Sequence, residues 1–390
     1  MSEISDMIQR LCPDGVEYRK LGEVCKMQRG TSLTKKASNE GIYPVISGGR
    51  EPAFYCDMFN REGETITVAG SGAGAGYLQF WNEPIFVCDA FSFIGTSLLD
   101  NKYLFYCLTN MQEAIYATKK GGGVPHVHIS SIEDFEIPVP PLEVQRKIVE
   151  VLDNFSELTA ELTAELTARQ KQYEYYRDNL LNFNRGGQVA SDVKWMKMSE
   201  VFEIRNGYTP SKAKPEFWES GIIPWFRMED IRQNGRILSD SILHITSEGV
   251  KGKGLFKANS FILATTATIG EHALIIADSL ANQRFTNLKI CKSLENELTI
   301  KYVFYYLFVV DEWCKANTNV SGFASVDMAK FKNLLFPIPP LSEQERIVSI
   351  LDRFEALTTD LTSGLPAEIK ARQQQYEYYR DQLLTFKRAN

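Results

Sequence analysis

An internal repeat constrains this 390-residue chain more than any other feature. Residues 168–183 read ARQKQYEYYRDNLLNF and residues 371–386 read ARQQQYEYYRDQLLTF, with thirteen of the sixteen positions identical. Upstream, PPLEVQRKIVEVLDNFSELT at 140–159 matches PPLSEQERIVSILDRFEALT at 339–358. The offset is 199 for this block and 203 for the later one, so the second copy carries four extra residues between them. We therefore expect two related halves.

The segments that precede the repeated blocks are related more weakly. VEYRKLGEVCKMQRG, which begins at Val16, aligns with VKWMKMSEVFEIRNG, which begins at Val193. A glycine-rich stretch that ends at Gly76 parallels a stretch that ends at Gly270. The order is thus variable domain, shared segment, variable domain, shared segment. The predicted boundaries are 1–141, 142–185, 186–340 and 341–390.

Each shared segment is predicted to be a long amphipathic helix, because its apolar residues recur every three or four positions after a Pro-Pro pair. A continuous helix of this length would measure roughly 60 Å, and its apolar stripe is most simply buried against the other copy. A spacer with no recognition role remains an alternative. The predicted helix–helix positions are Ile148, Leu152, Phe155, Leu162, Leu166, Tyr173, Tyr176, Leu180, Ile347, Phe354, Leu361, Ile369, Tyr376, Tyr379 and Leu383.

Two details distinguish the helices. Gly364 and Pro366 fall inside the second one, and a proline there predicts a kink or a short break. The first helix contains TAELTAEL at 159–166, a tandem tetrapeptide close to one helical turn per unit. An added unit would keep nearly the same face inward, so this segment can act as a ruler between the flanking domains.

The variable domains contain short β-type runs separated by Gly, Asn and Pro turns, followed by aromatic helical stretches at 103–116 and 302–313. Each is predicted to be mixed α and β, which makes the whole chain α+β. The formal net charge is −6; residues 16–141 carry 11 basic and 14 acidic side chains, and residues 193–340 carry 18 and 15. This balance excludes a binder that relies on positive charge alone, but it permits local basic patches.

Composition also limits the location and chemistry of the chain. Seven scattered cysteines without a CxxC pair make a disulfide framework and a zinc site unexpected. The sequence has neither an apolar run of membrane length nor a signal-peptide start, so a soluble cytoplasmic protein is expected. His126 and His128 lack further metal ligands, and we expect no metal.

Motifs of catalysis and cofactor binding are also missing. The glycine-rich run at 70–76 fails the GxGxxG spacing and is followed by no GxxxxGK[ST], and neither HExxH nor GxSxG occurs. We expect no cofactor and no catalysis by the chain alone. A methyltransferase with a degenerate glycine-rich loop remains a third possibility, because a tight glycine turn and a phosphate loop can look alike.

Glycine-rich and basic loops occur at matched places in the two variable domains, namely 72–76 with 265–270 and 121–128 with 319–327. A common use in DNA binding is predicted, and a shared structural turn is an equally good interpretation. For single basic residues, a solvated surface charge is the simpler interpretation. The candidate DNA-binding residues are Arg29, Lys35, Lys36, Ser71, Gly72, Gly74, Lys119, Lys120, His126, His128, Arg205, Lys212, Lys214, Arg227, Arg232, Lys251, Lys253, Thr265, Thr266, Arg284, Asn319 and Ser321.

The pattern resembles the specificity subunits of type I restriction–modification systems over essentially the whole chain. The markers are PVPPLEVQRKIVEVLD with QYEYYRDNLL and PIPPLSEQERIVSILD with QYEYYRDQLL. The resemblance implies two target-recognition domains joined by an antiparallel coiled coil, in a pseudo-twofold internal repeat. The unequal helices leave the spacing in question, and the recognition domains carry no motif that transfers base by base.

By the same resemblance, each recognition domain reads one half of a bipartite target in double-stranded DNA. Two methyltransferase subunits dock on the helical regions and flip adenines for N6 methylation, and motor–nuclease subunits join for cleavage. The internal symmetry agrees with this, since paired readers at a set spacing serve the same purpose in dimeric DNA-binding proteins. A coiled-coil protein–protein adaptor without DNA binding is the alternative function.

Overall fold

The computed structural model describes residues 2–121, 123–183, 192–252, 254–319, 324–359 and 364–389. It divides into two compact units. The first unit comprises Met1–Ala164 with Ala367–Asn390, and the second comprises Glu165–Pro366. Each unit therefore combines one variable domain with parts of both shared segments. The division into four segments remains a prediction from the sequence.

The first unit consists of nine described strands and several helices around them. Its strands are β1 (Tyr18–Lys20), β2 (Cys25–Arg29), β3 (Tyr43–Ile46), β4 (Phe54–Cys56), β5 (Thr65–Ala69), β6 (Leu78–Trp81), β7 (Phe86–Val87), β8 (Ala90–Gly95) and β9 (Glu136–Pro138). Its helices are α1 (Ser2–Leu11), α2 (Leu21–Val24), α3 (Asn101–Asn110), α4 (Gln112–Ala117), the first part of α5 (Leu142–Leu180) and α11 (Leu365–Leu383), with short 3₁₀ turns η1 (Lys35–Ala37) and η2 (Ile129–Ser131).

The second unit repeats this plan with additions. Its strands are β10 (Lys194–Lys197), β11 (Phe202–Asn206), β12 (Ile223–Phe226), β13 (Ile237–Leu238), β14 (His244–Ile245), β15 (Ser260–Ala264), β16 (His272–Ile275), β17 (Leu280–Ala281), β18 (Phe285–Ile290), β19 (Thr318–Asn319), β20 (Ser325–Val326) and β21 (Leu335–Ile338). Its helices are α6 (Met198–Val201), α7 (Met228–Asn234), α8 (Ile300–Ala316), α9 (Met328–Asn333), α10 (Leu341–Thr359) and the last part of α5, with 3₁₀ turns η4 (Pro215–Phe217), η5 (Ser247–Gly249) and η6 (Lys292–Leu294).

The two units share one sheet topology. The first has the strand orders β2-β8-β5-β6, β4-β3-β7 and β1-β9, and the second has β11-β18-β15-β16-β13, β14-β12-β17 and β10-β21. The additions in the second unit are α7 and β13, which lie between β12 and β14 in the chain, and the small β19-β20 ribbon. The α+β prediction is confirmed, and the weak sequence similarity between the variable domains reflects a common fold.

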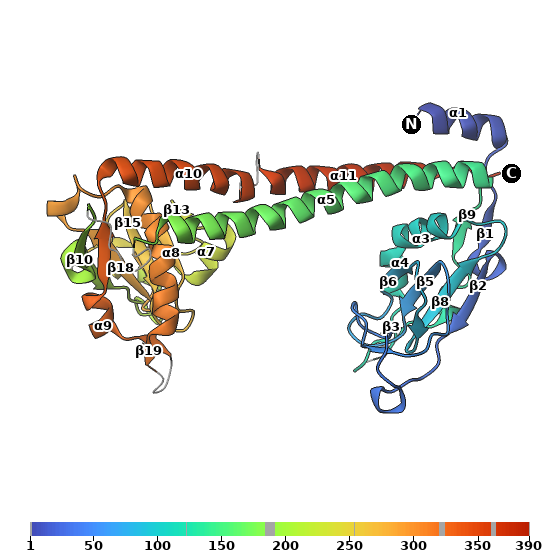
Figure 1. Cartoon of the computed structure of the whole chain (residues 1–390), viewed down its shortest axis with the longest axis horizontal. Coiled ribbons are helices and arrows are strands. Elements are labelled where there is room, and N and C mark those ends of the chain that lie inside the picture. The colour runs from blue at the N-terminus through green and yellow to red at the C-terminus, as the bar shows by residue number, and fades with distance from the viewer. Residues whose placement is uncertain are drawn as a thin grey trace. The chain divides into compact units, whose positions relative to one another are not determined.

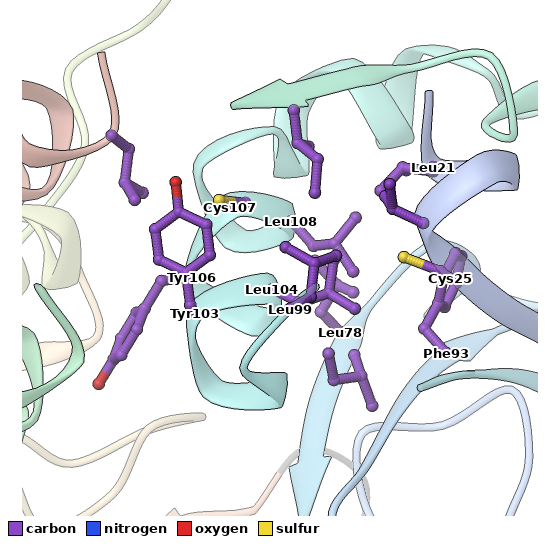
Figure 2. Packing of buried hydrophobic residues seen from close by; sticks show 14 of the residues in the cluster. Leu21, Cys25, Leu78, Phe93, Leu99, Tyr103, Leu104, Tyr106, Cys107 and Leu108 are labelled. Atoms are coloured by element: carbon purple, nitrogen blue, oxygen red, sulfur yellow. The ribbon is translucent and has the colours of Figure 1, made fainter. Parts of the chain in front are cut away.

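The main core of the first unit lies between the four-stranded sheet and α3, which contacts β5, β6 and β8. Figure 2 shows Leu104 and Leu108 of α3 in the cluster that also contains Leu78 of β6 and Phe93 of β8. α3 begins at Asp100, whose carboxylate accepts the backbone N–H groups of the first turn. In the second unit α8 contacts β15 and β16 in the same way (Figure 1).

Within each unit, the beginning of one shared helix packs antiparallel against the end of the other. In the first unit Ile148 and Leu152 of α5 share a buried cluster with Leu383 of α11. The rings of Phe155 and Tyr379 stack there at 5.3 Å. Figure 1 shows α11 beside the first part of α5. The apolar stripe on the first part of α5 is thus covered by residues more than 200 positions away in the chain.

The second unit contains the equivalent contact between the two shared helices. Ile347 of α10 shares a buried cluster with Leu181, and the partly buried Leu180 and Tyr173 pack against it. Tyr176 stacks on Phe354 at 5.4 Å. Of the other predicted interface residues, Tyr376 packs against the first-unit core, and Leu162, Leu166 and Ile369 are half-buried. Leu361 lies outside the described residues.

The second shared segment is divided into two helices. α10 ends at Thr359 and α11 begins at Leu365, whereas α5 is continuous. The predicted break near Gly364 and Pro366 is therefore confirmed, and Pro366 sits in the first turn of α11, where a missing backbone N–H has no cost. Among the described helices, none is both long and apolar enough to cross a membrane.

A buried glutamine connects the start of each shared helix to its variable domain. The Gln145 side chain accepts from the Asp100 backbone N–H at 2.9 Å and donates to the carbonyls of Leu98 and Pro140 at 2.8 and 2.7 Å. Gln344 makes the three equivalent bonds, and both side chains are fully buried. Both glutamines are part of the repeated sequence block, although the pattern gave no hint of this role.

Two tyrosines add a second connection. Tyr106 of α3 donates its hydroxyl proton to the Asp153 carboxylate at 2.6 Å, and Lys102 lies 2.6 Å from the same group. Burial raises the pKa of Tyr106, and its hydrogen bond to Asp153 raises it further, so the phenol stays protonated. Tyr305 repeats the contact with Asp352 in the second unit.

We expect Gln344→Leu to destabilise the second unit by roughly 3 kcal/mol. The substitution keeps the volume but leaves the Thr299 N–H and the carbonyls of Glu297 and Pro339 buried without partners. Tryptophan fluorescence during urea unfolding measures this, because four of the five tryptophans belong to this unit. The exposed Gln233→Leu is the matched control, and equal stability of the two variants would contradict the assigned role.

Candidate nucleic-acid interface

Two loops predicted from the sequence lie side by side in the first unit. The glycine-rich loop follows β5, and the Gly70 carbonyl accepts from the Val127 N–H at 3.0 Å. The Gly72 N–H donates to the carbonyl of Pro125 at 3.0 Å. The fold therefore joins residues 70–76 to residues 120–121 and 123–128 through their backbones.

Arg29 at the end of β2 completes this site. It lines a pocket of about 240 Å³ with Asp89, His126 and His128, and the two imidazole rings stack at 6.2 Å. Arg29 is exposed and forms no ion pair with another described residue. Ser71 donates its hydroxyl to Asp89. The pocket is smaller than most small-molecule sites, so its free cation and rings suit a surface-bound partner better.

A short hairpin carries the two lysines of the site. The backbones of Lys120 and His126 exchange hydrogen bonds at 2.8 and 2.9 Å, and Gly121 at φ 110° allows the turn. The Lys119 ammonium lies 4.0 Å from the centre of the Tyr116 ring. Both lysines are therefore held at the rim of the loop pair, where phosphate contact is possible.

The second unit builds the same framework from different residues. The Val326 N–H donates to the Thr265 carbonyl at 2.9 Å, and the Ala267 N–H donates to the carbonyl of Ala324 at 3.3 Å. The loop after β15 is thus joined to the segment before α9, as the loop after β5 is joined to the segment before η2. Thr266 pairs with Ser325 across the junction.

Backbone conformation confirms that the two loops correspond. Gly72 and Ala267 have φ of 79° and 67°, and Gly76 and Gly270 have φ of 82° and 79°. An alanine at positive φ is strained, so the turn is retained even where the residue does not favour it. The equivalent pairs are Gly70 and Thr265, Ser71 and Thr266, Gly72 and Ala267, Gly76 and Gly270, Asp89 and Arg284, and Val127 and Val326.

The side chains at these corresponding positions have different chemistry. The Gly70 N–H donates to the carbonyl of Asp89, and the Thr265 N–H donates to the carbonyl of Arg284. The same place thus holds a carboxylate in one unit and a guanidinium in the other. Arg284 is exposed and forms no ion pair among the described residues. Gln283, which the sequence pattern did not single out, precedes it and accepts from the Thr209 hydroxyl.

Several predicted DNA-binding residues lie away from the loop pair. Lys35 and Lys36 are on η1, and Arg227 and Arg232 belong to the start and the body of α7. In the second unit Lys214 and Lys251 meet instead at the ring of Phe217, 5.0 and 5.9 Å from its centre, and Lys212 precedes Lys214 in the same exposed loop. Arg205 donates to the carbonyls of Gly254 and Leu255. Lys253 and Ser321 lie outside the described residues.

The remaining candidates are part of the loop framework. Thr265 is buried, and its hydroxyl is 2.9 Å from that of Thr286, so its side chain holds the loop from inside. Asn319 is exposed in β19. The Thr286 hydroxyl also donates to the Asn206 side chain at 3.1 Å. Asn206 is the second-unit residue that corresponds to Arg29 of the first unit. Each of these residues stays a prediction as far as DNA contact is concerned.

A buried polar cluster in the second unit offers no catalytic site. His272 and Asp311 pair at 2.7 Å with 0% and 3% of their side chains exposed, and Arg236 lies 3.6 Å from the carboxylate. No substrate can reach a pair that is covered in this way. In the described part of the chain, no three His, Cys, Asp or Glu side chains group as metal ligands would.

Comparison with known proteins identifies the family of the chain. The family described as "Type I restriction modification DNA specificity domain" matches residues 13–169 and 190–371. The specificity subunit of the EcoR124I/EcoR124II type I restriction enzyme of Escherichia coli is 34% identical over 99% of this chain and 98% of its own. The chain belongs to the family of type I restriction–modification specificity subunits.

Other relatives extend the comparison. The EcoprrI specificity subunit of Escherichia coli is 55% identical over 203 residues, which are 50% of this chain and 51% of that protein. The specificity subunit of Mycoplasma genitalium matches with a TM-score of 0.55 at 18% identity and covers 95% of both chains. A chain from a study of complex assembly in a type I system reaches 0.65 at 18% identity, over 95% of this chain and 97% of its own. At this identity the solved structures support the shared fold.

The glycine loop gives a test of its close approach to the backbone of Gly48. A Cβ on Gly74 would lie 2.4 Å from the Gly48 carbonyl oxygen, which is backbone and cannot rotate away. We expect Gly74→Ala to destabilise the first unit by about 1–3 kcal/mol. A Cβ on Gly123 would meet nothing within 4 Å, so Gly123→Ala should leave stability unchanged. Thermal unfolding measures both, and equal midpoints would contradict the close approach.

Proposed function

We propose that this chain is the DNA-reading subunit of a type I restriction–modification complex and catalyses no reaction by itself. Each recognition domain reads one half of a bipartite target through its loop pair. DNA and other subunits of the system are its partners, and the complex works in the cytoplasm, where the DNA is. The supporting observation is one backbone framework, present twice, with different side chains on equivalent positions.

This observation favours recognition of a DNA sequence because it separates the shape of the loops from the chemistry of their side chains. Backbone hydrogen bonds hold the loops in the same shape in both domains, and the exposed side chains are free to differ. In the first domain Arg29, His126 and His128 are available to base edges, and Lys119 and Lys120 to phosphates. In the second domain Gln283 and Arg284 offer the amide and guanidinium groups that pair with adenine and guanine. Different groups at matched positions imply unequal half-sites.

Docking of methyltransferase subunits is assigned to the shared helices. Tyr175 and Tyr378 occupy the same position of the repeated block and are 66% and 61% exposed. Their neighbours Tyr176 and Tyr379 pack between helices. Each outer tyrosine contacts only the ring of that neighbour among the described ring pairs, at 5.6 and 5.4 Å, and keeps most of its own surface exposed. Exposed tyrosines are frequent anchors in protein interfaces. Two equivalent exposed tyrosines are consistent with the docking of two methyltransferase copies. Motor–nuclease subunits join the same complex.

The decisive experiment compares DNA sequences. The chain is purified with its methyltransferase partner and offered a bipartite site taken from the methylated positions of the host genome, together with a scrambled site. We expect preferential and salt-dependent binding of the intact site. Equal binding of the two would refute the proposal. Binding that is absent at all salt concentrations, with an intact complex, would instead support the alternative of a protein–protein adaptor.

We expect Arg284→Ala to relax only the half-site read by the second domain. Loss of one bidentate base contact costs about 1–3 kcal/mol of discrimination at one position. Methylation mapping with the variant measures which bases become tolerated. The exposed Arg353→Ala on α10 serves as the control and should change neither half. A change in both half-sites, or in none, would contradict the assignment.

Insertion of a third TAEL unit after Leu166 tests the ruler. Four residues add about 6 Å along a helix and keep nearly the same face inward. The methylated site should therefore retain both half-sites with a longer gap between them. Methylation mapping again provides the measurement, and altered half-site bases at an unchanged gap would refute the ruler.

A further inference from the structure

The backbone holds Asp89 and Arg284 at one equivalent position in the two domains. The Asp89 carbonyl accepts from the Gly70 N–H at 3.0 Å, and the Arg284 carbonyl accepts from the Thr265 N–H at 2.9 Å. The residue after each of them begins β8 or β18 and pairs with the last residue of β5 or β15. The framework therefore fixes this position whatever side chain it carries.

The two side chains have opposite hydrogen-bonding capacity, and each keeps a polar group free. Oδ2 of Asp89 accepts from the Ser71 hydroxyl, and no described residue donates to Oδ1. The Arg284 side chain is exposed, and its guanidinium has no hydrogen bond or ion pair with a described residue. A carboxylate can only accept and a guanidinium can only donate. The same position thus offers an acceptor in one domain and donors in the other.

The surroundings of Asp89 leave Oδ1 accessible. A Cβ on Gly70 would lie 3.3 Å from this oxygen, so the glycine keeps the space beside it open. Asp89 lines the 240 Å³ pocket together with Arg29, His126 and His128. Arg29 forms no ion pair with the carboxylate, but its charge lies on the same pocket and offsets the repulsion between Asp89 and phosphates.

The reversal of charge argues against a phosphate contact at this position. Phosphate oxygens only accept, so a position that contacts the DNA backbone in both domains needs a donor in both. The edges of the bases present groups of both kinds. Cytosine N4 and adenine N6 donate, whereas guanine N7 and O6 accept. An acceptor in one domain and a donor in the other therefore suit base edges.

We infer that Asp89 binds the exocyclic amino group of a cytosine or an adenine, and that Arg284 binds O6 and N7 of a guanine. Ser71 is a positioning residue, because its hydroxyl occupies Oδ2 and leaves Oδ1 for the base. This inference rests on the proposed function and adds to it the kind of base edge that each domain selects at one position.

The first test is Asp89→Asn in the full-length chain, purified with its methyltransferase partner. Asparagine has nearly the same shape and can still accept from Ser71, but it presents an amino group where Oδ1 was. We expect the preference at one base pair of the first half-site to fall by about tenfold, with the second half-site unchanged. Competition binding with all four base pairs at each position measures this. The base pair that the wild type prefers there, C·G or A·T, shows which amino group is bound.

The second test is Arg284→Gln, measured in the same way. A glutamine amide pairs with N6 and N7 of adenine, so one position of the second half-site should change its preference from guanine to adenine. Arg284→Lys keeps the positive charge and separates the alternatives. If Arg284 contacts a phosphate, the lysine variant keeps the wild-type affinity and the glutamine variant loses affinity equally for all sequences. That result would overturn the assignment of Arg284.

Ser71→Ala acts on the same base pair without changing Asp89, and we expect a smaller loss of preference there. Glu83→Gln and Arg353→Gln are the matched controls, since both residues are exposed and lie outside the loop pair. Thermal unfolding verifies that every variant is folded.

Two results would overturn the assignment of Asp89. One is an unchanged base preference of Asp89→Asn in both half-sites, and the other is uniformly tighter binding to all sequences, which would show an effect of charge alone. The proposed function fails separately, when the wild-type complex shows no preference for its bipartite site.

Discussion

The burial of an apolar stripe on each shared helix is the interaction on which the rest of the structure depends. A helix as long as α5 cannot leave its apolar stripe in water, and one recognition domain does not cover the whole stripe. Each unit buries the stripe with parts of both shared helical segments. Ile148 and Leu152 share a buried cluster with Leu383, and Ile347 shares one with Leu181. Neither half of the sequence contains all the residues of its own core, so both copies are needed.

The polar contacts at the helix starts follow from this arrangement. Once the helices are shared between units, each recognition domain needs a rigid connection to the helix that begins beside it. Gln145 and Gln344 provide it by satisfying three backbone groups each, out of contact with water. The loops of the candidate DNA interface are built on the same principle, because backbone hydrogen bonds hold their shape while exposed side chains differ between the two domains.

Much of this was accessible from the sequence, for identifiable reasons. The repeat and its period showed two copies of a long amphipathic helix, and Pro366 marked the position of the break. The matched loops were also found, because glycines recur before the same segments. Gln145 and Gln344 could not be recognised, since a polar residue on a helix is normally exposed. The correspondence between the positions of Asp89 and Arg284 could be recognised only from the strand register. The exposure of Arg284 could be recognised only from the three-dimensional structure.

By itself, the sequence determined that the chain is a duplication with two helical segments and two divergent domains, because periodicity and identity are properties of neighbouring residues. Only the tertiary structure decided which helix part joins which domain, which loops meet and which side chains stay exposed. These depend on contacts between residues far apart in the sequence, from Gly70 with Val127 to Phe155 with Tyr379. No local pattern specifies such a contact, because many partners would bury the same apolar stripe equally well.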